Sequence, residues 1–412
     1  MRVLVVEDSA TVAKVLLHLF QQEPGIEVDL AKDFATAREL MEHNQYFAAL
    51  CDRCLPDAPN GEVIEWSLAK GLPTIVLTAQ MDEGERNRLQ GLGVVDYVIK
   101  ENRFSYQYAV NLVSRLNRNQ AYRVLVVDDS QVARKQVKDL LARHLFQVVE
   151  ADSADSALML LATNEFKLMI TDYEMPVMNG VELVCRVRER PGGDQLSIVG
   201  LSGQEEVSAK FIKYGANDFL RKPFFAEEFY CRINNLIKAW ELNQQLWQRA
   251  NLDYLTGVAN RRYLMSQLED ARTQAGQNNQ NLSLALLDVD RFKAINDQHG
   301  HQMGDRVLQV LARELSQSLE RFVIGRVGGE EFAVVMPGLN GDQAWRLIEA
   351  VRRKLTSTPL DLGDQKLAVS FSAGLCQAAP EDHTDELLRR ADEVLYQAKE
   401  AGRNLVLLEE DQ

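Results

Sequence analysis

The sequence predicts an α/β protein in which two doubly wound domains precede a different, α+β domain. The segment "RVLVVEDS" (2–9) returns as "RVLVVDDS" (123–130), so one domain is present in two copies. In each copy, Val/Leu runs typical of buried parallel strands alternate with amphipathic helical stretches such as "ATARELMEHN". After a long helical stretch the pattern changes, and "RVGGEEF" (326–332) lies between two strand-like runs. A length of 412 residues agrees with three domains of ~150 residues each.

The overall composition narrows the classes of partner. Hydrophobic residues make up 46% of the chain and charged residues 26%, as in ordinary globular proteins. The start "MRVLVVEDSA" meets an acidic pair too early for a signal peptide, and no apolar run is long enough to cross a bilayer. We therefore expect a cytoplasmic protein without membrane insertion. The formal net charge of −14 disfavours nucleic-acid binding, although an anionic nucleotide could bind where a metal and local Lys or Arg residues reverse the field.

Five polar residues follow four strand-like runs of the second copy. Asp128 and Asp129 follow the first run, Asp172 follows "KLMIT", Ser202 follows "IVGL" and Lys222 follows "DFLR". The carboxyl ends of parallel strands share one edge of a sheet, so these side chains are expected to meet there. Three carboxylates suit Mg²⁺ and leave room for phosphate oxygens, which a hydroxyl and an ammonium group can bind.

This second copy resembles the receiver domain of two-component response regulators along its whole length, including "DYEMPVMNG" and "KP". The resemblance implies a five-stranded parallel sheet, phosphorylation of Asp172 by a histidine kinase or phosphotransfer protein, and Mg²⁺ held with Asp128 and Asp129. It also implies that Ser202 and Lys222 bind the phosphoryl group. Phe219 matches the aromatic residue whose rotation accompanies phosphorylation.

The first copy carries the same set with departures. The matching residues are Glu7, Asp8, Asp52, Thr78, Tyr97 and Lys100. However, the loop after Asp52 is one residue longer than its counterpart, and Lys100 precedes Glu101 where the second copy has Pro223. Two interpretations stay open: a phosphorylated receiver with Asp52 as the acceptor, or a degenerate adaptor that acts only through contacts.

The helical stretch after the second copy contains a stripe with steps of four and three residues, typical of a helix that pairs with another helix. Its members are Phe229, Ile233, Leu236, Trp240, Asn243, Trp247 and Ala250. We expect a dimerising stalk, in which Asn243 would fix the register; packing on the neighbouring domain is the alternative.

The last domain places acids at a strand end and at a hairpin tip. Asp288 ends a strand, and Asp290 is expected to cap the helix that follows. The Gly328–Gly329 pair is a hairpin signal and allows close approach of a ligand, while Glu330 and Glu331 add carboxylates. Three carboxylates can hold one or two divalent ions for phosphoryl or nucleotidyl transfer.

Four blocks in this domain resemble the GGDEF family of diguanylate cyclases: "DYLTGVANRR", "DVDRFKAINDQHGHQMGD", "RVGGEEF" and "ADEVLYQAKEAGRN". The resemblance implies condensation of two GTP molecules to cyclic di-GMP, with Mg²⁺ or Mn²⁺ held by Asp288, Glu330 and Glu331. Glu330 would help to deprotonate the ribose hydroxyl. Asn296 and Asp305 match guanine contacts, and Lys293, Lys399 and Arg403 match phosphate contacts. Many members carry an inhibitory R-x-x-D before the hairpin; Leu319 and Phe322 replace it here, which predicts no product inhibition through that site.

We therefore expect receiver domains at 1–120 and 121–237, a helical stalk at 238–252 and a GGDEF domain at 253–412. Phosphorylation would favour a homodimer in which two GGDEF domains face each other. The alternatives are a nucleotide-binding module that signals without catalysis, and a phosphate sink.

Overall fold

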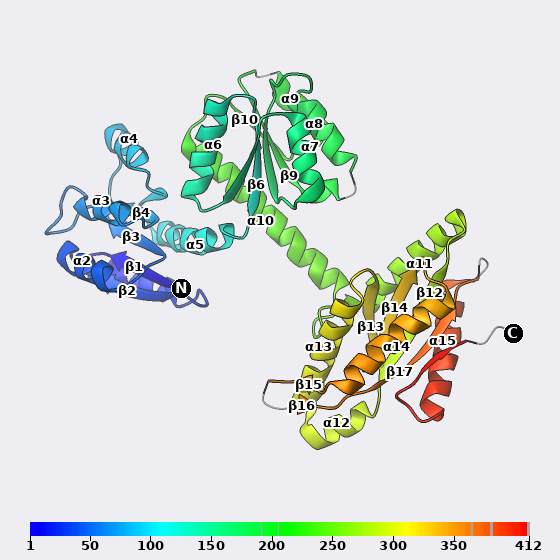
Figure 1. The fold of residues 1–412 in the computed structure, drawn as a ribbon. Helices are drawn as coiled ribbons and strands as arrows, with labels where there is room; N and C mark the ends of the chain where they lie inside the picture. The colour runs from blue at the N-terminus through cyan, green and yellow to red at the C-terminus, as the bar shows by residue number, and fades with distance from the viewer. Residues whose placement is uncertain (191, 205, 364–365, 380–381, 410–412) are drawn as a thin grey trace. The chain divides into compact units, whose positions relative to one another are not determined.

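The computed structural model describes residues 1–190, 192–204, 206–363, 366–379 and 382–409 (Figure 1). The chain forms two compact units, Met1–Trp240 and Glu241–Gln412, of which the first contains both repeated domains. Among the described helices, none combines the length and the hydrophobicity that crossing a membrane requires.

The first repeated domain is a parallel five-stranded sheet in the order β2-β1-β3-β4-β5. Its strands are β1 Arg2–Val6, β2 Glu27–Ala31, β3 Ala48–Asp52, β4 Thr74–Thr78 and β5 Asp96–Ile99. Its helices are α1 Ala10–Phe20, α2 Phe34–His43, α3 Glu62–Ala69, α4 Glu83–Leu92 and α5 Arg103–Asn119. Helices α1 and α5 pack on one face of the sheet and α2, α3 and α4 on the other. The central strands are thus buried on both faces, which explains their continuous apolar runs.

The second repeated domain has the same topology, with the order β10-β9-β8-β6-β7. Its strands are β6 Arg123–Val127, β7 Gln147–Ala151, β8 Leu168–Asp172, β9 Ser197–Ser202 and β10 Asp218–Arg221. Its helices are α6 Gln131–Arg143, α7 Ala154–Thr163, α8 Gly180–Arg188, the short 3₁₀ helix η1 Gly193–Gln195, α9 Val207–Lys213 and α10 Ala226–Asn251. Helices α6 and α10 cover one face, and α7, α8 and α9 cover the other (Figure 1). The predicted pair of doubly wound domains is confirmed.

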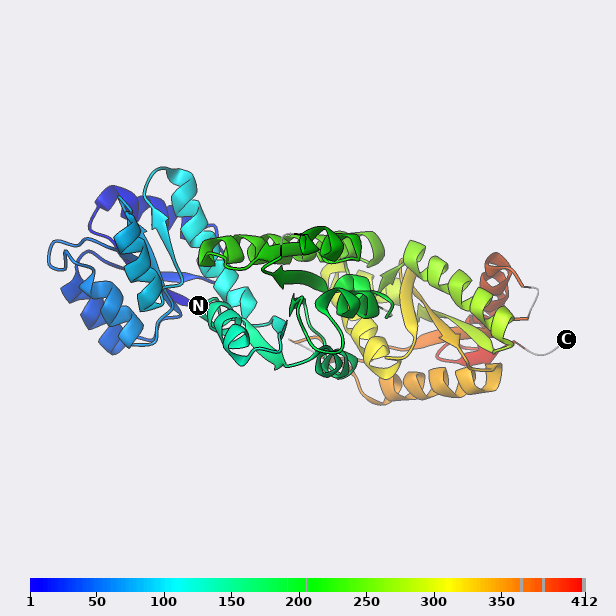
Figure 2. The same cartoon turned by 90° about the horizontal axis from the view of Figure 1, so that it is seen from above.

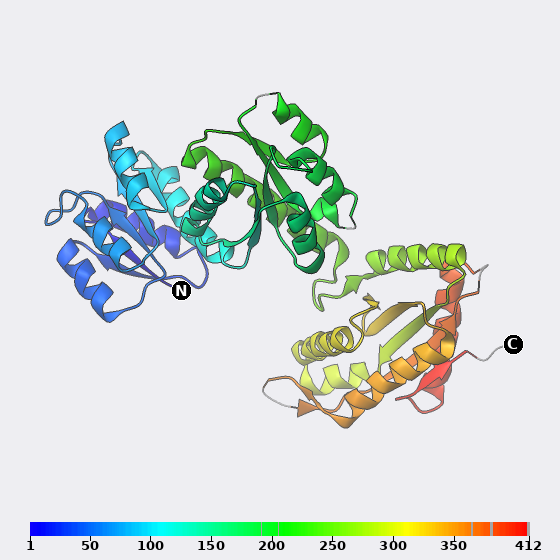
Figure 3. The same cartoon turned by 45° about the horizontal axis from the view of Figure 1, so that its top comes forward.

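The C-terminal domain is built on a six-stranded sheet in the order β11-β13-β14-β12-β17-β18. Its strands are β11 Ala259–Asn260, β12 Leu282–Val289, β13 Val323–Gly328, β14 Glu331–Pro337, β17 Phe371–Gln377 and β18 Val406–Leu408, and a separate pair is β15 Leu360–Asp361 and β16 Lys366–Leu367. Its helices are α11 Arg261–Asn278, α12 Phe292–His299, α13 His301–Ser318, α14 Gly341–Ser357 and α15 Thr384–Glu400. Helices α13 and α14 cover one face of the sheet (Figure 2), and α11 and α15 cover the other (Figure 3). The central strand β12 pairs antiparallel with both β14 and β17.

The first half of the predicted helical stripe packs on the second repeated domain. Phe229 and Ile233 are buried in the core of that domain, and Leu236 is partly buried against it. Further along, the Trp240 indole Nε1 donates a hydrogen bond to the Gln195 carbonyl oxygen at 3.1 Å. The expected boundary between residues 237 and 238 therefore lies inside one continuous helix, and the stripe up to Trp240 serves the core of the second domain.

The second half of the stripe belongs to the other unit. The Trp247 ring contacts Tyr263 of α11, with centroids 5.5 Å apart, and remains 44% exposed. Asn243 and Ala250 are exposed. These side chains are open to solvent in the single chain, so they can contact a second helix. That pairing remains a prediction.

Candidate functional sites

The five predicted residues of the second repeated domain lie at the carboxyl edge of its sheet. Asp172 is the last residue of β8, and Lys222 follows β10 directly. The Lys222 Nζ lies 2.6 Å from Asp172 Oδ1 and 2.9 Å from Asp128 Oδ2. Asp128 and Asp172 are buried, whereas Asp129 is exposed. The lysine thus bridges two of the three acids.

This cluster contains three acids and one lysine, so its negative charges outnumber its positive ones. Burial raises the pKa of Asp172 above its ordinary value, and the neighbouring Asp128 adds to the shift, although Lys222 opposes it. Burial acts to lower the pKa of Lys222, but its hydrogen bonds to Asp172 and Asp128 hold that pKa above the ordinary value. An oxygen-ligated divalent cation would fit this acid excess.

The expected switch residues of the second copy, Ser202 and Phe219, lie on β9 and β10. Ser202 ends β9, where its Oγ accepts a hydrogen bond from the Gln204 amide at 3.0 Å and its carbonyl accepts from the Lys222 amide at 2.9 Å. The Phe219 ring packs toward the interior, with its centroid 5.9 Å from that of Phe211.

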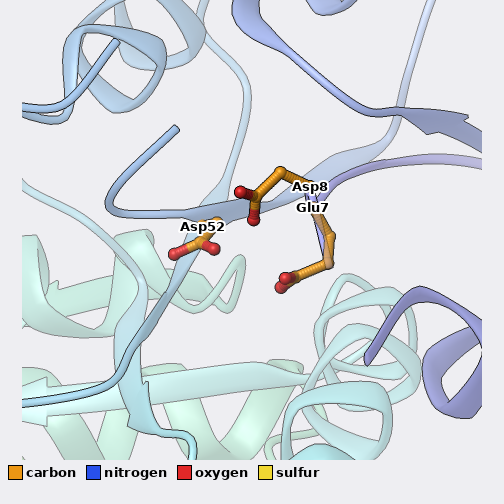
Figure 4. Close-up of side chains that lie close together, drawn as sticks. All are labelled: Glu7, Asp8 and Asp52. Atoms are coloured by element: carbon orange, nitrogen blue, oxygen red, sulfur yellow. The ribbon is translucent and has the colours of Figure 1, made fainter. Parts of the chain in front are cut away.

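The first copy forms a corresponding cluster, in which all three acids come together. Glu7, Asp8 and Asp52 each offer a carboxylate oxygen within 4.8 Å of the others (Figure 4), the one such group of three found among the described residues. The Lys100 Nζ lies 2.7 Å from Glu7 and 2.6 Å from Asp52. Lys100 therefore reaches the acids just as Lys222 does, although Glu101 replaces the proline that follows in the second copy. Burial raises the pKa of Glu7, against the effect of Lys100.

The aromatic residue of the first copy has a different neighbour from that of the second. The Tyr97 hydroxyl donates a hydrogen bond at 2.7 Å to Glu227, in the first turn of α10. Gln90 and Arg86 of α4 donate to the same carboxylate. Thr78, at the end of β4, is buried and donates to the Gln80 carbonyl at 2.7 Å.

The C-terminal domain brings two of its three predicted acids face to face. Asp288 and Glu331 are register partners on β12 and β14, and Glu330 stands in the turn just before β14. The Lys399 Nζ, on α15, lies 2.8 Å from Asp288 Oδ2. Burial raises the pKa of Asp288 despite Lys399, and burial followed by the charge of Asp288 raises the pKa of Glu331. The three carboxylates outnumber the one lysine beside them, and carboxylate oxygens are ligands that suit a divalent cation.

The hairpin tip leaves open space beside these acids. Gly329 has φ of +28°, and a Cβ built on it would have no neighbour within 4 Å. The Arg326 guanidinium holds the turn, because its Nε and Nη2 donate to the Gly329 carbonyl oxygen at 2.9 and 2.7 Å and its Nη1 lies 3.0 Å from Asp253 Oδ1. Sequence reasoning did not assign Arg326 or Asp253 a role, although both lie inside the quoted blocks "RVGGEEF" and "DYLTGVANRR".

An unpartnered amide oxygen marks a second part of the site. Asn296, on α12, has a buried Oδ1 that accepts no hydrogen bond from the described residues. It lies over Gly304 of α13, where a Cβ would come within 2.0 Å of it. Asp305 and Lys293 are exposed on the same two helices. A buried acceptor without a donor is costly, so a ligand that brings an N–H group would suit it.

Two of the three residues matched to phosphate contacts, Lys399 and Arg403, come from α15 and the turn after it. Lys399 lies in the last turn of the helix, and Arg403 is exposed three residues beyond its end. Gly402, Arg403 and Asn404 have φ values of +124°, +66° and +46°, so the arginine stands on a left-handed turn.

The expected capping role of Asp290 is wrong. The residue before α12 is Arg291, with φ of +55°, and no side chain caps that helix. The Asp290 carboxylate instead accepts hydrogen bonds from Ser370 Oγ, Ser372 Oγ and the Asn404 amide, at 2.7, 2.6 and 2.9 Å. Its position before a helix predicted a cap, but its hydrogen-bond partners come from the start of β17 and from the turn after α15, which are distant in the chain.

The two positions that replace the R-x-x-D pair are apolar and packed. Leu319 is 2% exposed in the core under α13, and Phe322 packs against the same core. Neither offers a polar group to a nucleotide.

Comparison with known proteins places all three domains. The family model described as the response regulator receiver domain matches residues 3–106 and 124–234, and the one described as the diguanylate cyclase, GGDEF domain, matches residues 250–405. Response regulator PleD of Caulobacter vibrioides is 32% identical over 300 residues, which cover 69% of this chain and 65% of PleD. A diguanylate cyclase of Vibrio cholerae is 40% identical over 167 residues, 40% of this chain and 51% of that protein.

A solved structure agrees with this assignment. The crystal structure of a two-component system response regulator/GGDEF domain protein is 42% identical, with a TM-score of 0.54, and covers 58% of this chain and 99% of its own. The chain spans less than two thirds of the length of PleD, 65% of that protein. Since the receiver matches alone take in more than half of the residues, the chain belongs to the response regulator receiver family, with two receiver domains followed by a GGDEF domain.

Proposed function

We propose that the chain is a phosphorylation-regulated diguanylate cyclase, which condenses two GTP molecules into cyclic di-GMP and two pyrophosphates. The observation that carries the proposal is the convergence of an acid pair, Asp288 and Glu331, with a lysine at 2.8 Å on one side of a glycine hairpin. The buried, donor-less Oδ1 of Asn296 supports a base-binding pocket in the same domain.

In the proposed reaction, the ribose 3′-oxygen of each GTP attacks the α-phosphorus of the other. A new P–O bond forms as the bond to the pyrophosphate oxygen breaks, and the hydroxyl proton passes to a base, for which Glu330 is the candidate. Asp288, Glu330 and Glu331 would hold Mg²⁺ or Mn²⁺, which supplies charge neutralisation at the phosphates and acidifies the hydroxyl. Lys293, Lys399 and Arg403 would bind phosphate oxygens.

Guanine would be recognised by Asn296 and Asp305. A carboxylate that accepts from guanine N1–H and N2–H rejects adenine, since adenine would leave these acceptors without donors. Because each half-site holds one GTP, the reaction requires two GGDEF domains facing each other, so a homodimer is the active form.

The receivers would control that encounter. A histidine kinase or phosphotransfer protein would donate a phosphoryl group to Asp172, and to Asp52 if the first receiver is also a substrate. The Lys222 and Lys100 bridges place an ammonium group beside each acceptor. Phosphorylation would shift the population toward the dimer, in which α10 pairs through its second half.

The experiment is GTP turnover by purified protein with Mg²⁺, with and without beryllofluoride, while products and sedimentation are followed in the same samples. Cyclic di-GMP formed faster as dimers accumulate is the expected result. Asp172→Asn and Asp52→Asn, separately, identify the controlling receiver. Bound GTP that stays unchanged would favour a non-catalytic nucleotide-binding module, and phosphotransfer without GTP consumption would favour a phosphate sink.

A further inference from the structure

The second aspartate of "DVDRF" has its hydrogen-bonding capacity taken up within the chain. Asp290 is 8% exposed, and three donors occupy its two oxygens: Ser372 Oγ on Oδ1, and Ser370 Oγ with the Asn404 amide on Oδ2. Its own amide donates to the Ser370 carbonyl oxygen at 2.9 Å. Although it stands two residues after Asp288, it is therefore committed to β17 and to the turn after α15.

That turn has a backbone that requires external support. Gly402, Arg403 and Asn404 are consecutive residues with positive φ, a region in which a non-glycine residue is strained. Such a conformation persists only where its surroundings fix it, and it is concentrated at sites where a side chain must be held in one place. Arg403 is the exposed side chain that this turn presents.

Asn404 is held at both of its polar ends. Its backbone N–H donates to Asp290 Oδ2, and its side-chain Oδ1 accepts from Arg352 Nη1 at 2.7 Å. Arg352 is itself fixed by two hydrogen bonds of 2.7 Å to Glu349 on α14. The turn is thus clamped between the end of β12 and helix α14, and the β12 attachment comes from Asp290.

We propose that Asp290 is a positioning residue that fixes the Gly402–Asn404 turn relative to Asp288, so that Arg403 is held in reach of the nucleotide phosphates. Asp288 lies at the end of β12 and Asp290 directly follows that strand. The same short segment therefore positions both the proposed metal-binding carboxylate and the phosphate-binding arginine. This inference rests on the proposed function for the role of Arg403. The attachment of the turn to Asp290 does not rest on it.

The test is a double-mutant cycle in the full chain with Asp290→Asn, Arg403→Ala and the double variant. Asp290→Asn keeps the size of the side chain but removes its charge and disturbs its acceptors. We expect it to raise the KM for GTP roughly 10- to 100-fold, as loss of a supporting contact does at other sites, with a smaller change in kcat. The double variant should be no worse than Arg403→Ala alone, because the arginine is already misplaced. Effects that multiply would overturn the proposal.

A second measurement does not depend on nucleotide. Amide hydrogen exchange of the segment 402–406, in the absence of GTP, should be faster in Asp290→Asn than in the parent protein. Asp297→Asn removes the same charge from the exposed surface of α12 and is the matched control, expected to change neither exchange nor KM. Unchanged exchange in Asp290→Asn would overturn the proposed attachment.

Two further outcomes are distinguishable. If the parent protein neither binds nor turns over GTP while Asp290→Asn still loosens the segment, the proposed function and the phosphate role of Arg403 fail together, and the attachment stands. If Asp290→Asn does not fold, Asn404→Ala replaces it, because it removes the Arg352 contact and puts an alanine at φ of +46°. It should then show the same faster exchange and the same non-additivity with Arg403→Ala; additivity would refute the role of the Gly402–Asn404 turn in holding Arg403, and with it the role proposed for Asp290.

Discussion

Gly304→Ala should impair GTP use without weakening the fold. A Cβ at this position would come within 2.0 Å of Asn296 Oδ1 and 3.0 Å of its Cγ, so the amide must move by more than an ångström. A guanine contact made by that oxygen would then be lost. The loss is worth ~1–3 kcal/mol, which corresponds to about 5- to 150-fold in the KM for GTP. Alanine is the better helix former by up to ~1 kcal/mol, so thermal stability should not fall in parallel.

The assay is steady-state cyclic di-GMP synthesis over a range of GTP concentrations, with thermal unfolding of the same samples. Gly276→Ala is the matched control: the residue is in helix α11, and an added Cβ would meet nothing within 4 Å. We expect Gly276→Ala to keep the KM and to be at least as stable as the parent. Combining Gly304→Ala with Asn296→Ala should cost no more than Asn296→Ala alone, because the clash and its target disappear together. An unchanged KM in Gly304→Ala would refute the placement of Asn296 in a guanine pocket.

Three other predictions test separate parts of the chain. Glu331→Gln should slow synthesis by at least ~100-fold through loss of a metal ligand, and turnover near the parent rate would contradict that assignment. Since Leu319 and Phe322 replace the R-x-x-D pair, added cyclic di-GMP should not inhibit initial rates; competitive inhibition with tight binding would show a product site. Burial lowers the pKa of His144 to about 4, whereas a histidine in the unfolded chain has a pKa of ~6.5, so protonation of His144 favours the unfolded state. The free energy of unfolding should therefore fall by ~3 kcal/mol as the pH drops from ~6.5 to about 4. Urea unfolding from pH 7 to 4 should show a steeper loss in the parent than in His144→Gln, which keeps a donor for the Val95 carbonyl but does not titrate; equal slopes would exclude His144 as the cause.

Much of the fold follows from the sequence because its signals are local. The repeated strand "RVLVV" and the polar residues that follow the buried runs locate the strands and their edge, and the glycine pair locates the hairpin between β13 and β14. Asp290 could not be assigned in this way, since its partners lie about 80 and 114 positions away in the chain. The same limit applies to the stripe on α10, where one periodic pattern covers two environments: Ile233 is buried in a receiver core and Trp247 lies against Tyr263.

The comparison of the two receivers shows where sequence differences matter. Lys100 is followed by Glu101, where the second copy has Pro223 after Lys222, yet the bridge from Lys100 to Asp52 is as short as that from Lys222 to Asp172, 2.6 Å in each. The two copies therefore present similar acid–lysine geometry, and the longer loop after Asp52 does not disturb it. They differ instead in what surrounds the aromatic residue: Tyr97 donates to Glu227 at the start of α10, whereas Phe219 packs on Phe211 within its own domain. Because the lysine reaches the acceptor equally closely in both copies, replacing Asp52 and Asp172 one at a time is the experiment that distinguishes a phosphorylated receiver from an adaptor.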